Sequence, residues 1–126
     1  PNLAPDEAIV IRVTGAANDF GTIKIAIYDN KQTFNNPDRA IATNSLELEN
    51  GEASWTVPAA ELPKKIAIAV YHDENEDDIL TLNRFGIPSE RYGFSRNARG
   101  LVGPPEFDEA SISTPKGGTT LDLFIR

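Results

Sequence analysis

The chain has 126 residues, of which 40% are hydrophobic and 25% are charged, and its formal net charge is −7. This length suits one hydrophobic core, so we expect residues 1–126 to form a single domain. The acidic balance argues against nucleic-acid binding, which needs a basic face. Cysteine is absent, which excludes disulfides, thiolate metal sites and cysteine nucleophiles. The longest apolar run, residues 66–71, is too short for a transmembrane segment.

Short segments of alternating apolar and polar residues follow one another along the chain, and this period of two is typical of half-buried strands. The predicted strands cover residues 7–13, 21–29, 45–49, 52–57, 64–71, 109–113 and 119–126. The segment 64–71 (KKIAIAVY) is apolar on both faces, as expected of a central strand. Asn50-Gly51 predicts a hairpin with a type I′ turn, because both residues tolerate a positive φ.

These strand signals, with no pattern for a long helix, predict an all-β fold. We expect a two-sheet sandwich of immunoglobulin-like or transthyretin (prealbumin)-like type. Only residues 31–40 suggest a short helical turn, around Phe34. The segment 72–107 is unusual, because connections in compact domains usually have about 4–6 residues. Long ordered loops tend to carry function, so we expect the functional residues here.

The long loop contains several spaced motifs, which are VYHDEN (70–75), FGIP (85–88), YGFS (92–95), NARG (97–100) and GPP (103–105). Together they resemble an uncharacterised bacterial family, domain of unknown function 2141, whose members are mostly short exported β-sandwich proteins. The resemblance implies a periplasmic or secreted protein whose signal peptide has been removed. The family usually has asparagine-glycine in place of Asp77-Asp78, and an aspartate in place of Thr81. Because the family's role is unknown, the resemblance implies fold and export rather than an activity.

The segment HDENEDDIL (72–80) places several acidic residues directly after an apolar strand. Asp73, Asn75 and Asp77 stand at alternate positions, like the first three ligands of a calcium loop. The main-chain carbonyl of Ile79 and a water held by Thr81 fit the next two ligand positions. The sequence therefore predicts a candidate metal site, and calcium is the one cofactor that it suggests.

An EF-hand is excluded, because the glycine and the bidentate glutamate that it needs are replaced by Asp78 and Arg84. A calcium loop of a β-sandwich could take its last carboxylate from Glu74 or Glu90. Two alternatives remain open. Arginines of segment 84–99 could neutralise the acids through bidentate pairs, or the acidic turn could simply be solvated.

His72 is the only histidine, which excludes sites built from several histidines. Beside Asp73 it could serve as the acid–base pair of a small hydrolase-type enzyme, with an arginine of segment 84–99 facing it. That alternative requires His72 to be accessible in a concave pocket. A structural role requires it to be buried and hydrogen-bonded. Ser95 lacks the context of a catalytic nucleophile, which predicts a turn or helix-capping role.

Arginines and aromatic residues alternate in the second half of the long loop. The candidates for binding a small anionic or sugar ligand are Arg84, Arg91, Tyr92, Arg96 and Arg99. Alternatively, Phe94 and Phe107, with Tyr92 and Phe85, anchor the loop on one sheet as a satellite core. We expect a monomeric, non-enzymatic domain with a binding or structural role at the cell envelope.

Overall fold

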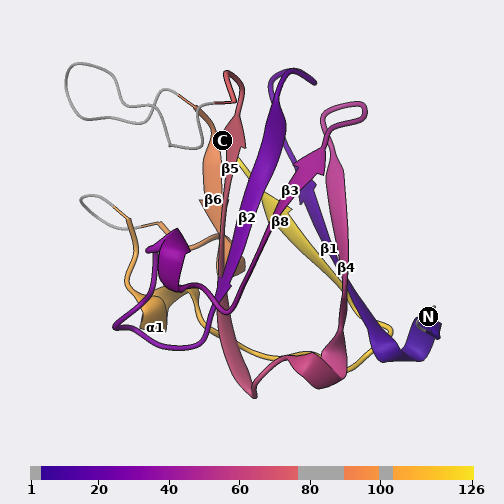
Figure 1. Cartoon of the computed structure of the whole chain (residues 1–126), viewed down its shortest axis with the longest axis vertical. Coiled ribbons are helices and arrows are strands. Elements are labelled where there is room, and N and C mark those ends of the chain that lie inside the picture. Colours follow the sequence, from indigo (N-terminus) through magenta and orange to yellow (C-terminus); the bar gives the residue numbers. More distant parts are fainter. Residues whose placement is uncertain (1–3, 77–89, 100–103) are drawn as a thin grey trace.

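The computed structural model describes residues 4–76, 90–99 and 104–126. Two β-sheets face each other in this part of the chain (Figure 1). One sheet has three strands in the order β4-β1-β8, and the other has the order β3-β2-β5-β6 with β7 paired to β5. The predicted two-sheet, all-β sandwich is confirmed.

The described elements are short, and most are strands. The strands are β1 (Ala8–Thr14), β2 (Thr22–Tyr28), β3 (Ala42–Glu47), β4 (Ala53–Pro58), β5 (Lys65–Asp73), β6 (Tyr92–Phe94), β7 (Ile112–Ser113) and β8 (Thr120–Phe124). The helical elements are η1 (Pro5–Glu7), η2 (Pro37–Arg39), η3 (Ala59–Glu61), η4 (Ser95–Asn97) and α1 (Phe107–Ala110), of which only α1 is an α-helix. The strand pairs are antiparallel, except that β1 and β8 are parallel.

The alternating segments before residue 72 all form strands, with ends that shift by a few residues. Asn50 and Gly51 have the predicted positive φ values, 55° and 77°. The prediction of one continuous loop over 72–107 is wrong, because residues 92–94 form β6. The strand predicted over 109–113 is also largely wrong. Glu106 and Glu109 form a capping box that starts α1, so only residues 112–113 remain extended.

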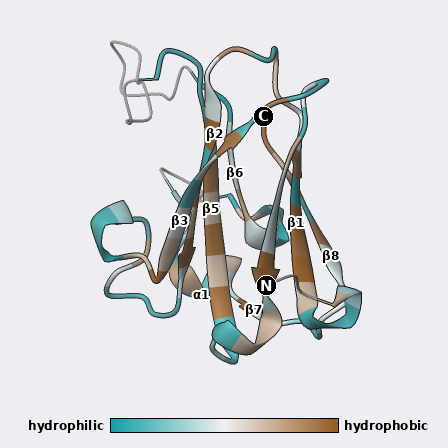
Figure 2. Cartoon of the chain, turned by 45° about the vertical axis from the view of Figure 1, so that its right-hand side comes forward, coloured by the Kyte–Doolittle hydropathy of each residue, from teal (hydrophilic) through white to brown (hydrophobic). Residues whose placement is uncertain are grey.

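The main core lies between the two sheets. Alternate residues of β1, β2 and β5 meet there, which is why their isoleucines and valines recur with a period of two. The fully enclosed members include Ile9, Ile11, Ile23, Ile27, Ile66 and Ile68. Figure 2 shows this concentration of apolar residues on β1, β2 and β5, with hydrophilic residues on the connections. Trp55 is only half-buried and packs against the edge of this core.

A second, smaller core covers the outer face of the five-stranded sheet. It contains Tyr28, Phe94 and Phe107, and Phe34 from the turn at 31–35 packs against it. The ring centroids of Phe34 lie 5.4 Å from Tyr28 and 5.9 Å from Phe107. The satellite-core interpretation is therefore confirmed for Phe94 and Phe107. In the described ranges, no helix is long and apolar enough to cross a membrane.

Burial raises the pKa of Tyr28 to about 12, because an enclosed phenolate would lose its hydration. The folded state thus holds the phenolic proton more tightly than the unfolded state, whose tyrosine pKa is about 10. The resulting contribution to the unfolding free energy is complete below about pH 10 and is lost as the pH rises towards about 12. Tyr28→Phe should remove this alkaline loss in chemical denaturation, whereas Tyr92→Phe should keep it. An alkaline loss unchanged by Tyr28→Phe would contradict the assignment.

Candidate functional site at the end of strand β5

His72 lies near the end of β5, and 0% of its side chain is exposed. It pairs with Ile23 of β2, so its ring projects towards the space between the sheets. The ring Nε2 lies 2.6 Å from the carbonyl oxygen of Phe20, and it must donate because a carbonyl only accepts. Nδ1 lies 3.7 Å from Oε1 of Glu74 and has no hydrogen-bond partner among the described residues. This geometry is the one expected if His72 has a structural role, which requires a buried and hydrogen-bonded side chain.

The turn before β2 contacts β5 at one further point and the turn between β3 and β4 at another. Gly21 has a φ of 67°, and a Cβ atom there would overlap the carbonyl oxygen of Asp73. The carboxylate of Asp19 accepts hydrogen bonds from the main-chain nitrogens of Asn50 and Gly51, at 3.0 Å and 2.7 Å. The turn before β2 therefore links β5 to the tight turn at Asn50-Gly51, which connects β3 of one sheet to β4 of the other.

Asp73 projects to the opposite face of the sheet from His72, because adjacent residues of a strand alternate in direction. It is also fully enclosed, with 0% exposure. The two side chains therefore do not form the acid–base pair that the enzyme alternative requires. Next along the chain, the main-chain nitrogen of Glu74 donates to Oε2 of Glu90 at 2.8 Å. Glu90 is 7% exposed, so the structure brings a second buried carboxylate to the main chain beside Asp73.

The candidate calcium ligands are only partly within the described residues. Asp73 is enclosed and Asn75 is exposed, whereas Asp77, Ile79 and Thr81 lie outside the described ranges. Within those ranges, no group of three His, Cys, Asp or Glu side chains is placed to hold a metal ion. A calcium site would thus need ligands beyond the ones that the structure describes.

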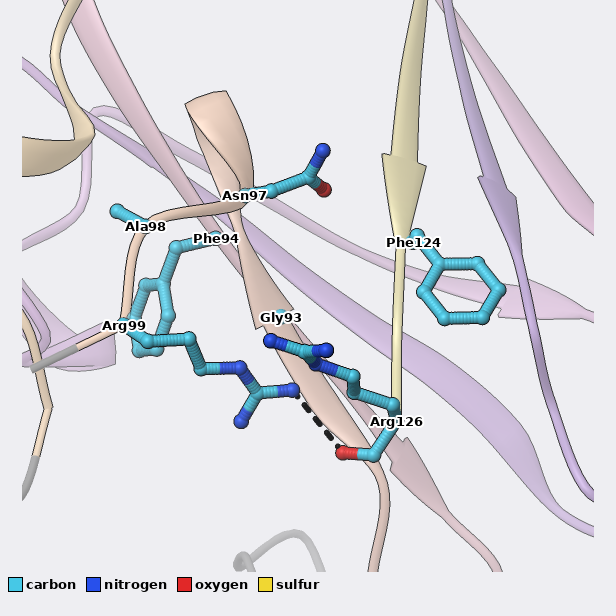
Figure 3. Close-up of a pocket in the computed structure, with 7 residues that line it drawn as sticks. All are labelled: Gly93, Phe94, Asn97, Ala98, Arg99, Phe124 and Arg126. Carbon is cyan, nitrogen blue, oxygen red and sulfur yellow. Dashed lines mark hydrogen bonds between the residues drawn. The ribbon is translucent and has the colours of Figure 1, made fainter.

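The described arginines of the long loop bond to main-chain oxygens. Arg91 Nη1 lies 2.6 Å from the oxygen of Gly15. Arg96 Nη1 lies 3.4 Å from the oxygens of Asp108 and Ser111. Arg99 Nη2 lies 2.9 Å from the oxygen of Tyr92 and 3.1 Å from that of Arg126 (Figure 3). Across the described chain, these three arginines form no ion pair with an aspartate or glutamate. The arginine-pairing alternative is therefore not seen for them among the described residues, whereas Arg84 and its possible partners Asp77 and Asp78 lie outside the described ranges.

Two of the ligand candidates come together. The guanidinium of Arg99 lies 4.1 Å from the ring centroid of Tyr92, which is a stacked cation–π arrangement. Arg91 instead reaches the turn before β2, and Arg96 reaches the main chain around α1.

Residues 11–122 match the bacterial family described as an uncharacterised protein conserved in bacteria, DUF2141. The chain belongs to this family. The match runs from within β1 to within β8, so it confirms the resemblance that the loop motifs predicted. No curated protein and no solved structure matches the chain.

In this DUF2141 domain, Ser95 lies in a turn, η4, which is one of the two roles predicted for it, but its side chain does not cap the start of a helix. Its hydroxyl is buried, accepts a hydrogen bond from the main-chain nitrogen of Ile68 at 2.9 Å, and donates to the carbonyl oxygen of Ala110. Ser95 thus ties β5 to α1. Neither this link nor the roles of Asp19 and Phe20 had a sequence signal beyond the presence of turn-forming residues at 18–21.

The close contact at Gly21 can be separated from its backbone strain by comparing two glycines of the DUF2141 domain. Gly51 also has a positive φ, but a Cβ there would only approach the oxygen of Ala16, at 3.3 Å. We expect Gly51→Ala to lower the unfolding free energy by about 1 kcal/mol and Gly21→Ala by about 2–4 kcal/mol. Urea denaturation measures both values. Equal losses would mean that the contact with Asp73 adds nothing.

Proposed function

We propose that this DUF2141 domain is a non-catalytic binding or structural module, monomeric and exported to the periplasm or the cell surface. The observation that carries the proposal is the enclosure of His72, whose Nε2 donates to the Phe20 carbonyl. Export is supported by the family resemblance. Detection of the protein in a periplasmic or culture-supernatant fraction of its native cells tests this part of the proposal.

A catalytic histidine must exchange protons with a substrate or with water. The Nε2 proton of His72 is engaged by a main-chain carbonyl, and the ring is closed off from solvent. Asp73 projects to the other face of the sheet. Acid–base chemistry by this pair would require the end of β5 to open, so the geometry favours a role in holding the fold.

Binding is favoured by the distribution of positive charge in the second half of the long loop. Arg91, Arg96 and Arg99 are held through main-chain oxygens, and none of them forms an ion pair with an aspartate or glutamate of the described chain. Such guanidinium groups suit a small anionic ligand, and the Tyr92 ring adds an aromatic surface on which the C–H face of a sugar can pack.

His72→Phe tests the structural role, because it removes the donor and leaves the Phe20 carbonyl without its partner. We expect the unfolding free energy to fall by about 1–3 kcal/mol, and by less in His72→Gln, which keeps a donor group. The same variants should leave the hydrolysis of model esters and phosphoesters at the level of the wild type. Hydrolysis by the wild type that His72→Gln abolishes, at unchanged stability, would instead establish the enzyme alternative.

We further propose that the loop after β5 binds calcium weakly. Support comes from Asp73 and Glu90, two buried carboxylates at the base of this loop, and from Asn75, an exposed amide two residues after Asp73 in the chain. The remaining ligands would be Asp77, the carbonyl of Ile79 and a water on Thr81. Calcium prefers oxygen ligands of this kind, carboxylates and side-chain or main-chain carbonyls.

Calcium should stabilise the domain if this proposal is correct. Loops of extracellular modules bind calcium at about 10⁻⁴–10⁻³ M. At about 1 mM free calcium and a Kd near 10⁻⁴ M, the gain is roughly 1.4 kcal/mol, or a rise in Tm of about 3–6 °C. Magnesium should substitute poorly, because it demands a stricter octahedral geometry.

The double variant Asp73→Asn with Asp77→Asn should abolish the calcium response. The matched control is Asp6→Asn with Asp38→Asn, which removes the same charge from two exposed aspartates of η1 and η2. Differential scanning calorimetry with calcium, magnesium and a chelator measures the response. A Tm that stays unchanged at several times about 1 mM free calcium would contradict the calcium proposal.

A further inference from the structure

Asn50 and Gly51 form the tight turn that leads the chain from one sheet to the other. Two main-chain hydrogen bonds between Glu49 and Glu52, at 2.9 Å and 3.1 Å, close the turn. Asn50 is exposed and Gly51 is half-buried. An asparagine that precedes glycine in an exposed turn is especially prone to lose its side-chain amide, because glycine has no Cβ atom to hinder ring closure.

The loss of this amide proceeds through the main chain. The nitrogen of Gly51 gives up its proton to hydroxide and attacks Cγ of Asn50, so that a new N–C bond closes a succinimide ring. The bond from Cγ to the side-chain nitrogen breaks, and this nitrogen takes a proton from water and leaves as ammonia. Water then opens the ring at either carbonyl carbon and leaves an aspartate or an isoaspartate. Water is the only co-reactant, and nothing is oxidised or reduced.

The nitrogen that must attack is engaged in the folded domain. The main-chain nitrogen of Gly51 donates to Oδ1 of Asp19 at 2.7 Å, and that of Asn50 donates to Oδ2 at 3.0 Å. Removing the Gly51 proton would break a hydrogen bond to a charged acceptor and would place a second negative charge beside the carboxylate. Asp19 therefore opposes the first step of the reaction.

Asp19 is held in place by contacts on both sides of it in the chain. Before it, the main-chain nitrogen of Ala16 donates to the carbonyl oxygen of Gly51 at 3.3 Å. After it, the carbonyl oxygen of Phe20 accepts the hydrogen bond from the His72 ring. The carboxylate is thus positioned before its hydrogen bonds form, and less conformational entropy is lost when they do.

A carboxylate can also act as a general base, which would speed the reaction instead of slowing it. Two observations favour protection. A carboxylate is a far weaker base than the anion of a main-chain amide, so it cannot keep the Gly51 proton, whereas its negative charge still opposes that anion. The hydrogen bonds between Glu49 and Glu52 also resist the main-chain rotation that brings the Gly51 nitrogen to Cγ of Asn50.

We propose that Asn50 is a latent deamidation site that the carboxylate of Asp19 protects. The aspartate product would add a second negative charge beside Asp19, and the isoaspartate product would add a carbon atom to the main chain of the turn. Either product would weaken the hold of the turn before β2 on the turn between β3 and β4. The inference goes beyond the binding role proposed above and does not depend on it.

Incubation of the folded domain at mildly alkaline pH, followed by peptide mass spectrometry, measures the rate of amide loss at Asn50. Asp19→Ala should raise this rate about tenfold, the factor expected for the loss of a hydrogen bond to a charged group. The matched control is Asp38→Ala, which removes a carboxylate from an exposed position of η2 and should leave the rate unchanged. An Asp19→Ala rate equal to or below that of the wild type would overturn the proposal, and so would an equal rise in the control.

Val70→Ala separates local protection from global stability. It leaves a cavity in the buried core at β5 and lowers the unfolding free energy without touching the turn. Urea denaturation places the two variants on one stability scale. Amide loss at Asn50 should be faster in Asp19→Ala than in Val70→Ala, even where Val70→Ala is the less stable of the two. A rate that follows the unfolding free energy alone would overturn the role of Asp19.

Asn50→Asp reproduces the aspartate product and tests its consequence. It should lower the Tm by about 1–3 °C through repulsion between exposed like charges, and by less when Asp19→Ala is also present. Differential scanning calorimetry of the two single variants and the double variant measures this coupling. A Tm loss of the same size with and without Asp19 would overturn the proposed effect of the modification on the turn.

Discussion

The hydrogen bond from the His72 ring to the Phe20 carbonyl joins segments that are 52 residues apart in the chain. It lies at the end of the inter-sheet core, where an isoleucine or valine would otherwise continue the period of β5. A polar ring is tolerated there because one of its nitrogens is satisfied by a carbonyl that the turn before β2 turns inwards. His72 also bonds through its main-chain nitrogen to the carbonyl of Arg91, so β6 depends on the same point.

The five-stranded sheet is buried on both faces, and this explains the composition of its two central strands. Strands β2 and β5 place isoleucine and valine towards the other sheet, and alanine with Tyr28 towards the outer core. The small alanines let Phe94, Phe107 and α1 pack close to the sheet.

The strands up to β5 could be predicted because each has enough alternating residues to define a face. Strand β6 could not, since three residues with a central glycine have no period to detect. Helix α1 forms where the alternating pattern predicted a strand over 109–113. Its capping box is a local interaction that favours the helix over extended structure. The hydrogen-bond partners of the arginines were even harder to predict. Nothing in a sequence distinguishes an arginine that faces a carboxylate from one that faces a carbonyl, because the acceptor is set by where the main chain turns.

Family membership could be predicted from the loop motifs, but the roles of individual residues within those motifs could not. Asp19 and Gly21 lie far from the motifs in the chain and still determine how the end of β5 is held. Their side-chain types indicate only a turn. The partner of a turn residue depends on the packing of two sheets, which a local pattern does not contain.

The parallel pairing of β1 with β8 also governs how the sandwich folds. Val10 lies opposite Thr120, so the central strand of the smaller sheet acquires one of its two neighbours only through a contact of very long range. The chain entropy of closing that loop must be overcome before the contact is rewarded, and such topologies typically fold in milliseconds to seconds. Until β8 docks, β1 presents an open strand edge and Ile11 and Val13 lack part of their cover. The docking of β8 therefore closes the core and removes the edge through which two incomplete chains would pair.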